Sequence, residues 1–184
     1  MYRIEKNKLY FNHNFDEQIN KNIIEAIRLN NVTDLIFGWN FKQPLDNLPN
    51  CIKSILFMSY YYDLPLDNLP NSIETIRLSK YFDQPVDNLP NSVHTIYFGD
   101  HFDQRIDNLP DSIKRIYFTI TGHFNRKIIN LPIGIEEIVL PREYSRSIGK
   151  LPEGLKKICV HYKYPYYEDL KKLVKVDVLY NYFW

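Results

Sequence analysis

Short segments in which apolar and polar residues alternate recur along most of the chain. In each of them two apolar residues stand two positions apart, as Ile76 and Leu78 do, and polar residues occupy the positions between and before them. Because side chains along a strand alternate between its two faces, this pattern predicts short strands with one buried face. The inward pairs are Leu9/Phe11, Leu35/Phe37, Ile55/Phe57, Ile76/Leu78, Ile96/Phe98, Ile116/Phe118, Ile138/Leu140, Ile158/Val160 and Val176/Val178.

A tandem repeat sets the distance between these strands. The motif Asp-Asn-Leu-Pro occurs at 46–49, 67–70, 87–90 and 107–110, with degenerate copies at 129–132 and 149–152. The prolines of the six copies are 21, 20, 20, 22 and 20 residues apart. A period near 20 predicts a solenoid, in which one small unit is stacked many times. We therefore expect a mainly β, right-handed solenoid over 1–184, with a parallel concave sheet and about nine rungs of 20–22 residues.

A large aromatic residue follows most of the strands by four positions, and by one or two more at Tyr62 and Phe124. Rings stacked at strand spacing would form a continuous internal spine, each with a large buried area. We interpret the position as structural and not as part of a ligand site. The predicted spine consists of Phe15, Phe41, Tyr62, Phe82, Phe102, Phe124, Tyr144 and Tyr164.

The segments that return from one strand to the next contain proline, which excludes a regular helix and predicts an extended convex side. The two ends differ from this pattern. Residues 1–32 are expected to form an amino-terminal cap, with a helix from Asn20 to Leu29 that buries Ile23, Ile24 and Ile27. Residues 165–184 are expected to form a carboxyl-terminal cap, with a short helix over 166–173 and a final strand. Its last aromatic residues, Tyr180, Tyr182, Phe183 and Trp184, are interpreted as a lid, or alternatively as an exposed edge that pairs with another chain.

Composition narrows the function classes further. The chain has 23 basic and 22 acidic residues, and the basic ones are scattered, so we expect no nucleic-acid partner. No apolar stretch reaches the ~20 residues of a membrane span, and the amino terminus lacks the pattern of a signal peptide. Cys51 and Cys159 are five repeats apart, ~24 Å at strand spacing, which is too far for a disulfide. A reducing cytoplasm, or the host cytoplasm if the chain is viral, is the expected location.

No motif for catalysis, a cofactor or a metal ion is found, and we predict a protein that is not an enzyme. The recurring acids Asp63, Asp83 and Asp103 could form a calcium ladder, but Asp side chains in turns more often accept hydrogen bonds from backbone amides. Cys159 falls at an outward strand position with only His161 nearby, so it is interpreted as an ordinary surface cysteine.

The outward positions of the strands supply the candidate binding residues. Solenoids bind partners through the concave sheet, and tyrosine and arginine are enriched among the residues that dominate binding energy. The alternative is that aromatic and branched residues are there only because they suit strands. The predicted partner-binding residues are Trp39, Leu56, Arg77, Tyr97, Arg115 and Tyr117.

The repeat resembles the Phe-Asn-Ile-Pro, or FNIP, family, a relative of the leucine-rich repeats found in giant viruses of amoebae and in social amoebae. The matching segments are Phe41–Pro44, Phe82–Pro85, Phe102–Arg105 and Phe124–Lys127, and the resemblance covers roughly 33–164. It implies a solenoid used for protein contacts, with no catalytic residues. The copies after residue 122 lose the Asp-Asn pair and depart from the family pattern.

These observations predict a protein-interaction module that binds a protein partner through the concave sheet. A structural or self-assembling protein, for example a homodimer, is the first alternative. The second, which rests on the family resemblance alone, is the substrate-recognition part of a ubiquitin-ligase complex. The segment before the first clear repeat is too short for an F-box of the chain's own.

Overall fold

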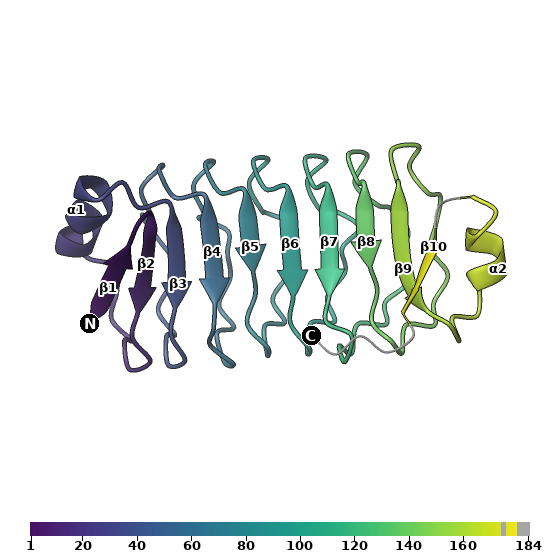
Figure 1. Ribbon diagram of the computed structural model, residues 1–184, viewed down its shortest axis with the longest axis horizontal. Helices are drawn as coiled ribbons and strands as arrows, with labels where there is room; N and C mark the ends of the chain where they lie inside the picture. The colour runs from purple at the N-terminus through teal and green to yellow at the C-terminus, as the bar shows by residue number, and fades with distance from the viewer. Residues whose placement is uncertain (174–175, 180–184) are drawn as a thin grey trace.

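The computed structural model describes residues 1–173 and 176–179. Within these residues the strands β1 to β10 form one sheet, in which they lie in sequence order (Figure 1). The strands are Tyr2–Glu5, Lys8–Phe11, Asp34–Phe37, Ser54–Phe57, Thr75–Arg77, Thr95–Phe98, Arg115–Phe118, Glu137–Val139, Lys157–His161 and Val176–Leu179. Helix α1 (Lys21–Leu29) lies between β2 and β3, and helix α2 (Tyr167–Leu170) lies between β9 and β10.

The predicted parallel sheet is confirmed. From β2 to β10 each strand pairs in parallel with the next, and the inward residues are in register. Ile76, for example, lies between Ile55 of β4 and Ile96 of β6. This is the frame that the alternation of apolar and polar residues predicts.

The spacing of the turns is regular only in the middle of the chain. From β3 to β9 the paired residues follow one another at intervals of 20, 21, 20, 20, 22 and 20 residues, which makes six turns of the predicted length. The first turn, from Leu9 to Leu35, takes 26 residues, and the last, from Ile158 to Val176, takes 18. Nine uniform rungs were therefore the wrong expectation, because each outer turn contains a helix.

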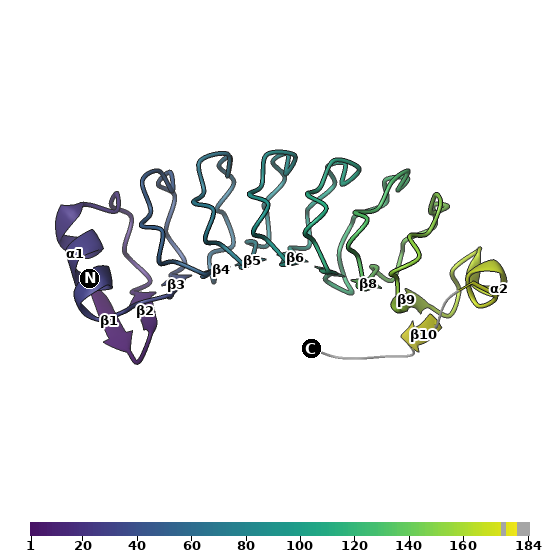
Figure 2. The same ribbon diagram turned by 90° about the horizontal axis from the view of Figure 1, so that it is seen from above.

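The sheet lies on the inner, concave side of an arc (Figure 2). Between β3 and β9 the return limbs on the convex side contain turns and extended segments but no helix, as the prolines predict. Neither of the described helices has the length and apolar character that a membrane span requires.

The core runs along the whole solenoid between the sheet and the return limbs. All the inward residues of β2 to β9 are buried, and so are the eight aromatic residues that follow the strands, none more than 5% exposed. Ring centroids of successive turns lie 5.9 Å apart for Phe15 and Phe41, 6.4 Å for Phe82 and Phe102, and 5.8 Å for Tyr144 and Tyr164.

Polar residues of the repeat connect each turn to the next. The Ser72 hydroxyl donates to the backbone oxygen of Ile52 in the preceding turn at 2.6 Å, and Ser92 and Ser112 make the same bond. The Asp63 carboxylate accepts a hydrogen bond from the backbone N–H of Asp83 at 2.8 Å, and Asp83 accepts one from Asp103. The recurring acids thus bind backbone amides, as one of the two interpretations expected, but the amide belongs to the next turn.

The amino-terminal end contains one element that the sequence did not reveal. Strand β1 pairs antiparallel with β2, and the turn between them places Lys6 at a positive φ of 56°. The predicted helix is present as α1, whose first turn is capped by the Asn20 side chain. Ile23 and Ile27 are buried there, whereas Ile24 is only partly buried.

At the carboxyl-terminal end, α2 is shorter than the predicted helix over 166–173, and β10 provides the predicted final strand in the predicted register. The residues expected to form a lid, Tyr180, Tyr182, Phe183 and Trp184, lie outside the described part of the chain.

We expect Phe102→Ala to lower the free energy of unfolding by ~3–5 kcal/mol, because it opens a cavity in the middle of the core. The matched control is Tyr61→Ala, which removes a ring that is 62% exposed and should cost less than ~1.5 kcal/mol. Urea unfolding followed by circular dichroism measures both. Equal losses for the two variants would contradict a packed aromatic core.

The hydroxyl of Tyr62 is buried and has no hydrogen-bond partner among the described residues. Tyr62→Phe should therefore raise the free energy of unfolding, by about 1 kcal/mol. Tyr164→Phe should lower it by about 1 kcal/mol, because the Tyr164 hydroxyl donates to the backbone oxygen of Arg146 at 2.8 Å. Thermal unfolding of the two variants tests the pair, and a lower melting temperature for Tyr62→Phe would refute the assignment.

Candidate functional site

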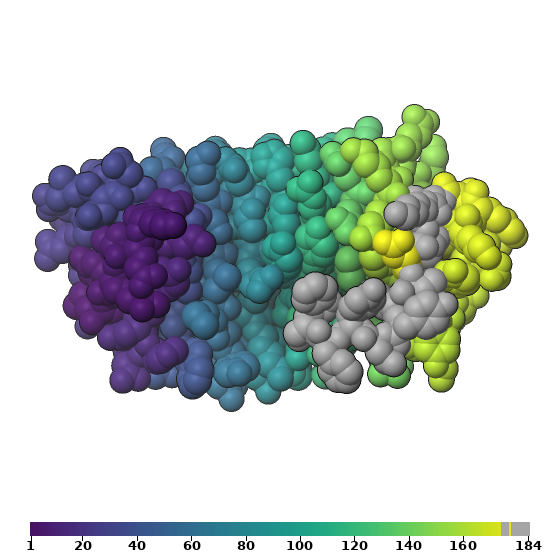
Figure 3. Space-filling model, viewed as in Figure 1, coloured from purple at the N-terminus to yellow at the C-terminus, as the bar shows by residue number. Residues whose placement is uncertain are grey.

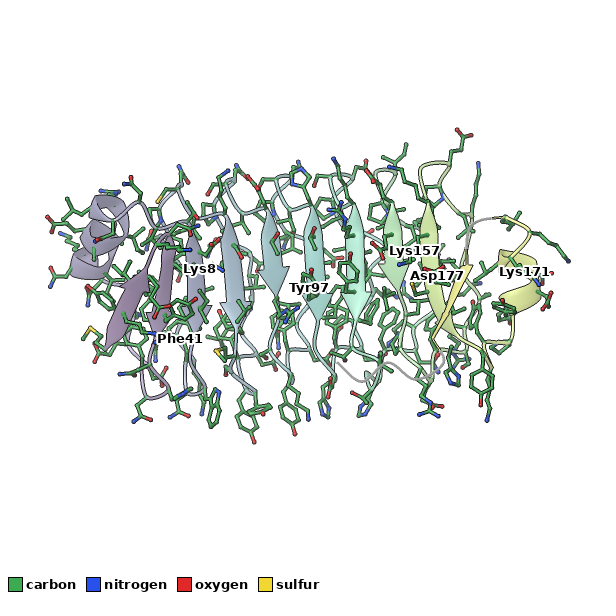
Figure 4. All side chains as sticks on the ribbon, in the orientation of Figure 1. Lys8, Phe41, Tyr97, Lys157, Lys171 and Asp177 are labelled. Carbon is green, nitrogen blue, oxygen red and sulfur yellow. The ribbon has the colours of Figure 1, made fainter. Side chains whose placement is uncertain are left out.

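The concave face of the sheet is the candidate site. Figure 3 shows this face hollowed along its middle, between the hairpin of β1 and β2 and the last strand. The outward residues of the central strands lie here, with Tyr97 over the middle of the sheet (Figure 4). They stand one strand spacing apart because the register of the parallel strands repeats the same position in each turn.

Three of the predicted residues form a continuous stack. The guanidinium of Arg77 lies over the ring of Tyr97, 4.5 Å from its centroid. The ring of Tyr97 in turn stacks on that of Tyr117, with centroids 4.7 Å apart. Cation–π and stacking contacts of this kind restrict the side chains before any partner arrives. Both rings are partly buried, whereas Arg77 is exposed.

The stack continues into charged residues that the sequence analysis did not select. The Tyr117 hydroxyl donates to a Glu137 carboxylate oxygen at 2.9 Å. Lys157 lies 3.2 Å from Glu137 and 3.1 Å from Asp177, whose side chain Figure 4 shows beside it. One line of contacts therefore crosses the sheet from β5 to β10.

These contacts change the acidity of two groups. Burial and the hydrogen bond to Glu137 raise the pKa of Tyr117 to about 12. Hydrogen bonds to Asp177 and Glu137 raise the pKa of Lys157. Each group keeps its proton because the neighbouring carboxylates favour the protonated form. At neutral pH the line thus carries two positive and two negative charges, with Tyr117 as a neutral donor.

The other predicted residues are less closely connected. Leu56 is partly buried on β4, next to Arg77 of β5. Arg115 is exposed on β7 and makes no ion pair among the described residues. Both lie on the same face as Tyr97, and both are available to a partner.

Trp39 does not belong to the central stack. It follows β3 and is 50% exposed, and its ring lies 4.6 Å from that of His13 and 6.3 Å from that of Tyr60. It is part of a row of ring side chains at the edge of the sheet where the strands end. We call this row the aromatic edge; it consists of His13, Trp39, Tyr60, Tyr61, Tyr81, His101 and His123.

Most of the aromatic edge was missed by the sequence analysis, although a signal was present. Tyr61, Tyr81, His101 and His123 each directly precede a buried ring of the core. Because neighbouring residues in an extended segment point to opposite sides, a ring next to a buried ring is expected outside. The rings of Tyr81 and His101 stack with centroids 4.2 Å apart.

Cys159 is a second correction. It was expected to be a surface cysteine, but it is only 4% exposed. Its short side chain stands between Val139 and Asp177 of the adjacent strands, and burial raises the pKa of its thiol. The thiol is therefore less reactive than that of an exposed cysteine. Within the described residues, no three histidine, cysteine, aspartate or glutamate side chains are placed to hold a metal ion.

Comparison with protein families agrees with the repeat geometry. The model of the FNIP repeat matches residues 30–60, 62–99 and 82–119. The chain is an FNIP-repeat protein. The matched residues include β3 to β7, the turns in which the spacing is most regular. FNIP and leucine-rich repeats are generally scaffolds without enzymatic activity.

A solved structure supports the fold of this FNIP-repeat protein. Its title is "The crystal structure of CroV588 a novel circular LRR protein structure", and it comes from a giant virus. The two chains are 24% identical, with a TM-score of 0.69 over 89% of the present chain. The present chain spans 28% of the length of CroV588. No curated protein matches at a significant level.

The hydrogen bond between Tyr117 and Glu137 predicts a pH dependence. Because the pKa of Tyr117 rises from 10.0 to about 12 on folding, its contribution to stability is complete below pH 10 and is lost as the pH approaches 12. The difference in unfolding free energy between the native chain and Tyr117→Phe should shrink over this interval. Urea titrations at several pH values measure it, and a constant difference would contradict the prediction.

Proposed function

We propose that this FNIP-repeat protein is a protein-interaction module whose concave face binds a protein partner. The observation that supports this most directly is the stack of Arg77, Tyr97 and Tyr117 in the hollow of the arc. Tyrosine and arginine are the residue types that contribute most to binding when a partner buries them. A repeat solenoid is also the type of fold that most often serves protein contacts.

The contacts within the stack reduce what binding costs. A side chain that is already held in one conformation loses little entropy when a partner covers it. Here the Tyr117 hydroxyl is fixed by Glu137, and the Tyr97 ring is held between Arg77 and the Tyr117 ring. Arg77 and Arg115 remain exposed and offer positive charge to the partner. We infer that the partner presents an apolar or aromatic surface with carboxylates beside it.

The experiment is an affinity capture from amoebal lysate with three baits. These are the native chain, the concave variant Tyr97→Ala/Tyr117→Ala, and the matched edge variant Tyr61→Ala/Tyr81→Ala. Both variants remove two partly or largely exposed tyrosines, and their melting temperatures are compared with that of the native chain first. We expect a protein that is captured by the native chain and the edge variant but lost with the concave variant.

Three results would redirect the proposal. Equal capture by all three baits would exclude the concave site, and loss with the edge variant alone would move the site to the aromatic edge. Capture of the bait chain only would support a self-assembling protein. Light scattering over a range of concentrations would then show whether a dimer forms, and whether the concave variant abolishes it.

A further inference from the structure

A pocket of about 520 Å³ lies away from the concave face, on the limbs that leave β6, β7 and β8. Four of its lining residues are basic, and none is acidic. Two serine hydroxyls, of Ser145 and Ser147, also line it. We call it the cationic pocket; its basic residues are Arg105, Arg126, Lys127 and Arg146.

Two of the arginines are held in the same way by the backbone of the preceding turn. Nε of Arg126 donates to the backbone oxygen of Asp103 at 2.9 Å, and Nε of Arg146 donates to that of Asn125 at 3.3 Å. The terminal guanidinium nitrogens of both side chains make no hydrogen bond among the described residues. Each guanidinium is therefore fixed at its inner nitrogen and keeps its outer donors for a ligand.

The backbone beneath the two arginines is also fixed. Ile128 and Ile148 form a parallel bridge between the two limbs, and the Gly149 N–H donates to the backbone oxygen of Ile128 at 2.8 Å. A Cβ at Gly149 would lie 2.0 Å from the backbone oxygen of Ile129, so glycine is what permits this approach. The two arginines consequently stand one strand spacing, about 4.8 Å, apart along the solenoid.

The positive charge of the pocket is not balanced within the described chain. Only Asp103 pairs with one of the four basic groups, at 3.1 Å from Arg126. Arg105 and Lys127 make no ion pair among the described residues. Like charges this close repel one another, so the cluster lowers the stability of the free chain, and an anion would relieve the repulsion.

The repeat itself does not require basic residues here. In the earlier turns Gln84 and Gln104 occupy the position that Arg126 and Arg146 occupy later, and Pro85 occupies the position of Arg105 and Lys127. Those turns form the same limbs with the same buried ring before them. The basic residues are therefore additions to a limb that forms without them, which points to a role in binding.

We propose that the cationic pocket binds a phosphate-bearing ligand. Arg126 and Arg146 grip one phosphate group, because a guanidinium presents paired donors that match phosphate oxygens. Arg105 and Lys127 contact a second anionic group, and the serine hydroxyls add further donors. The volume suits a small ligand or one phosphorylated side chain. The phosphate belongs either to a free small molecule or to a phosphorylated protein, and the site does not depend on the concave face.

The test is calorimetric titration of the full chain with inorganic pyrophosphate at near-physiological salt. The pocket variant is Arg126→Gln/Arg146→Gln, and the matched control is Lys114→Gln/Arg142→Gln, which removes the same charge outside the pocket. We expect the pocket variant to bind at least about tenfold more weakly and the control to bind like the native chain. Lys127→Gln removes a side chain without an ion pair in the described structure, and it provides a second variant if the first is less stable.

A peptide containing phosphoserine, compared with its unphosphorylated form, separates the two sources of phosphate. Tighter binding of this peptide than of pyrophosphate assigns the pocket to a phosphorylated partner, and the reverse order assigns it to a free anion. Equal weakening in the pocket and control variants would overturn the proposal, because charge alone would explain the binding. Tighter binding of a single-stranded oligonucleotide than of either probe would also overturn it.

Discussion

Each turn of this solenoid can bury its apolar strand and its aromatic ring only against the turns before and after it. A single turn has too few residues to enclose a core of its own, so the stability of the fold comes from contacts between neighbours. Buried rings of successive turns lie about 6 Å apart, as Phe124 and Tyr144 do at 5.9 Å, and the serine and aspartate ladders add hydrogen bonds in the same direction. The register between turns is what these contacts share, and all else follows from it.

The register also explains why functional residues can gather without long-range coordination. Once the inward positions are occupied by Ile, Leu and Phe, the outward position of each strand is free to vary. Neighbouring turns then bring these free positions side by side. The contact of Arg77 with Tyr97 and the basic residues of the cationic pocket arise in the same way, on two different sides of the repeat.

The regular part of the fold could be predicted because one rule applies to every copy. Alternation identified the inward residues, and the proline period identified the limbs. The hairpin strand β1 was not predicted, because its turn has no glycine and relies on Lys6 at a positive φ. The outer turns were not predicted in length, because helices replaced their limbs.

The candidate site was predictable in position but not in its contacts. Tyr97 and Tyr117 were identified from strand alternation, whereas the bond from Tyr117 to Glu137 depends on side-chain reach between adjacent strands. Trp39 was assigned to the same face, but it follows the end of its strand and turns toward the edge. The burial of Cys159 depends on the height of its neighbours, which a single column of residues does not reveal.

The turns that start at β4 and β7 are longer by one and two residues than the shortest regular turn, yet their strands remain in register with their neighbours. The additional residues lie between the strand and the buried ring, before Tyr62 and Phe124, at the exposed edge. An insertion there leaves the hydrogen-bonding ladder unchanged. Whole copies can likewise be gained or lost between near-identical segments such as 69–72 and 89–92. The gene can therefore lengthen or shorten by recombination, and each product inherits a complete stack with a new curvature span and a new combination of surface residues.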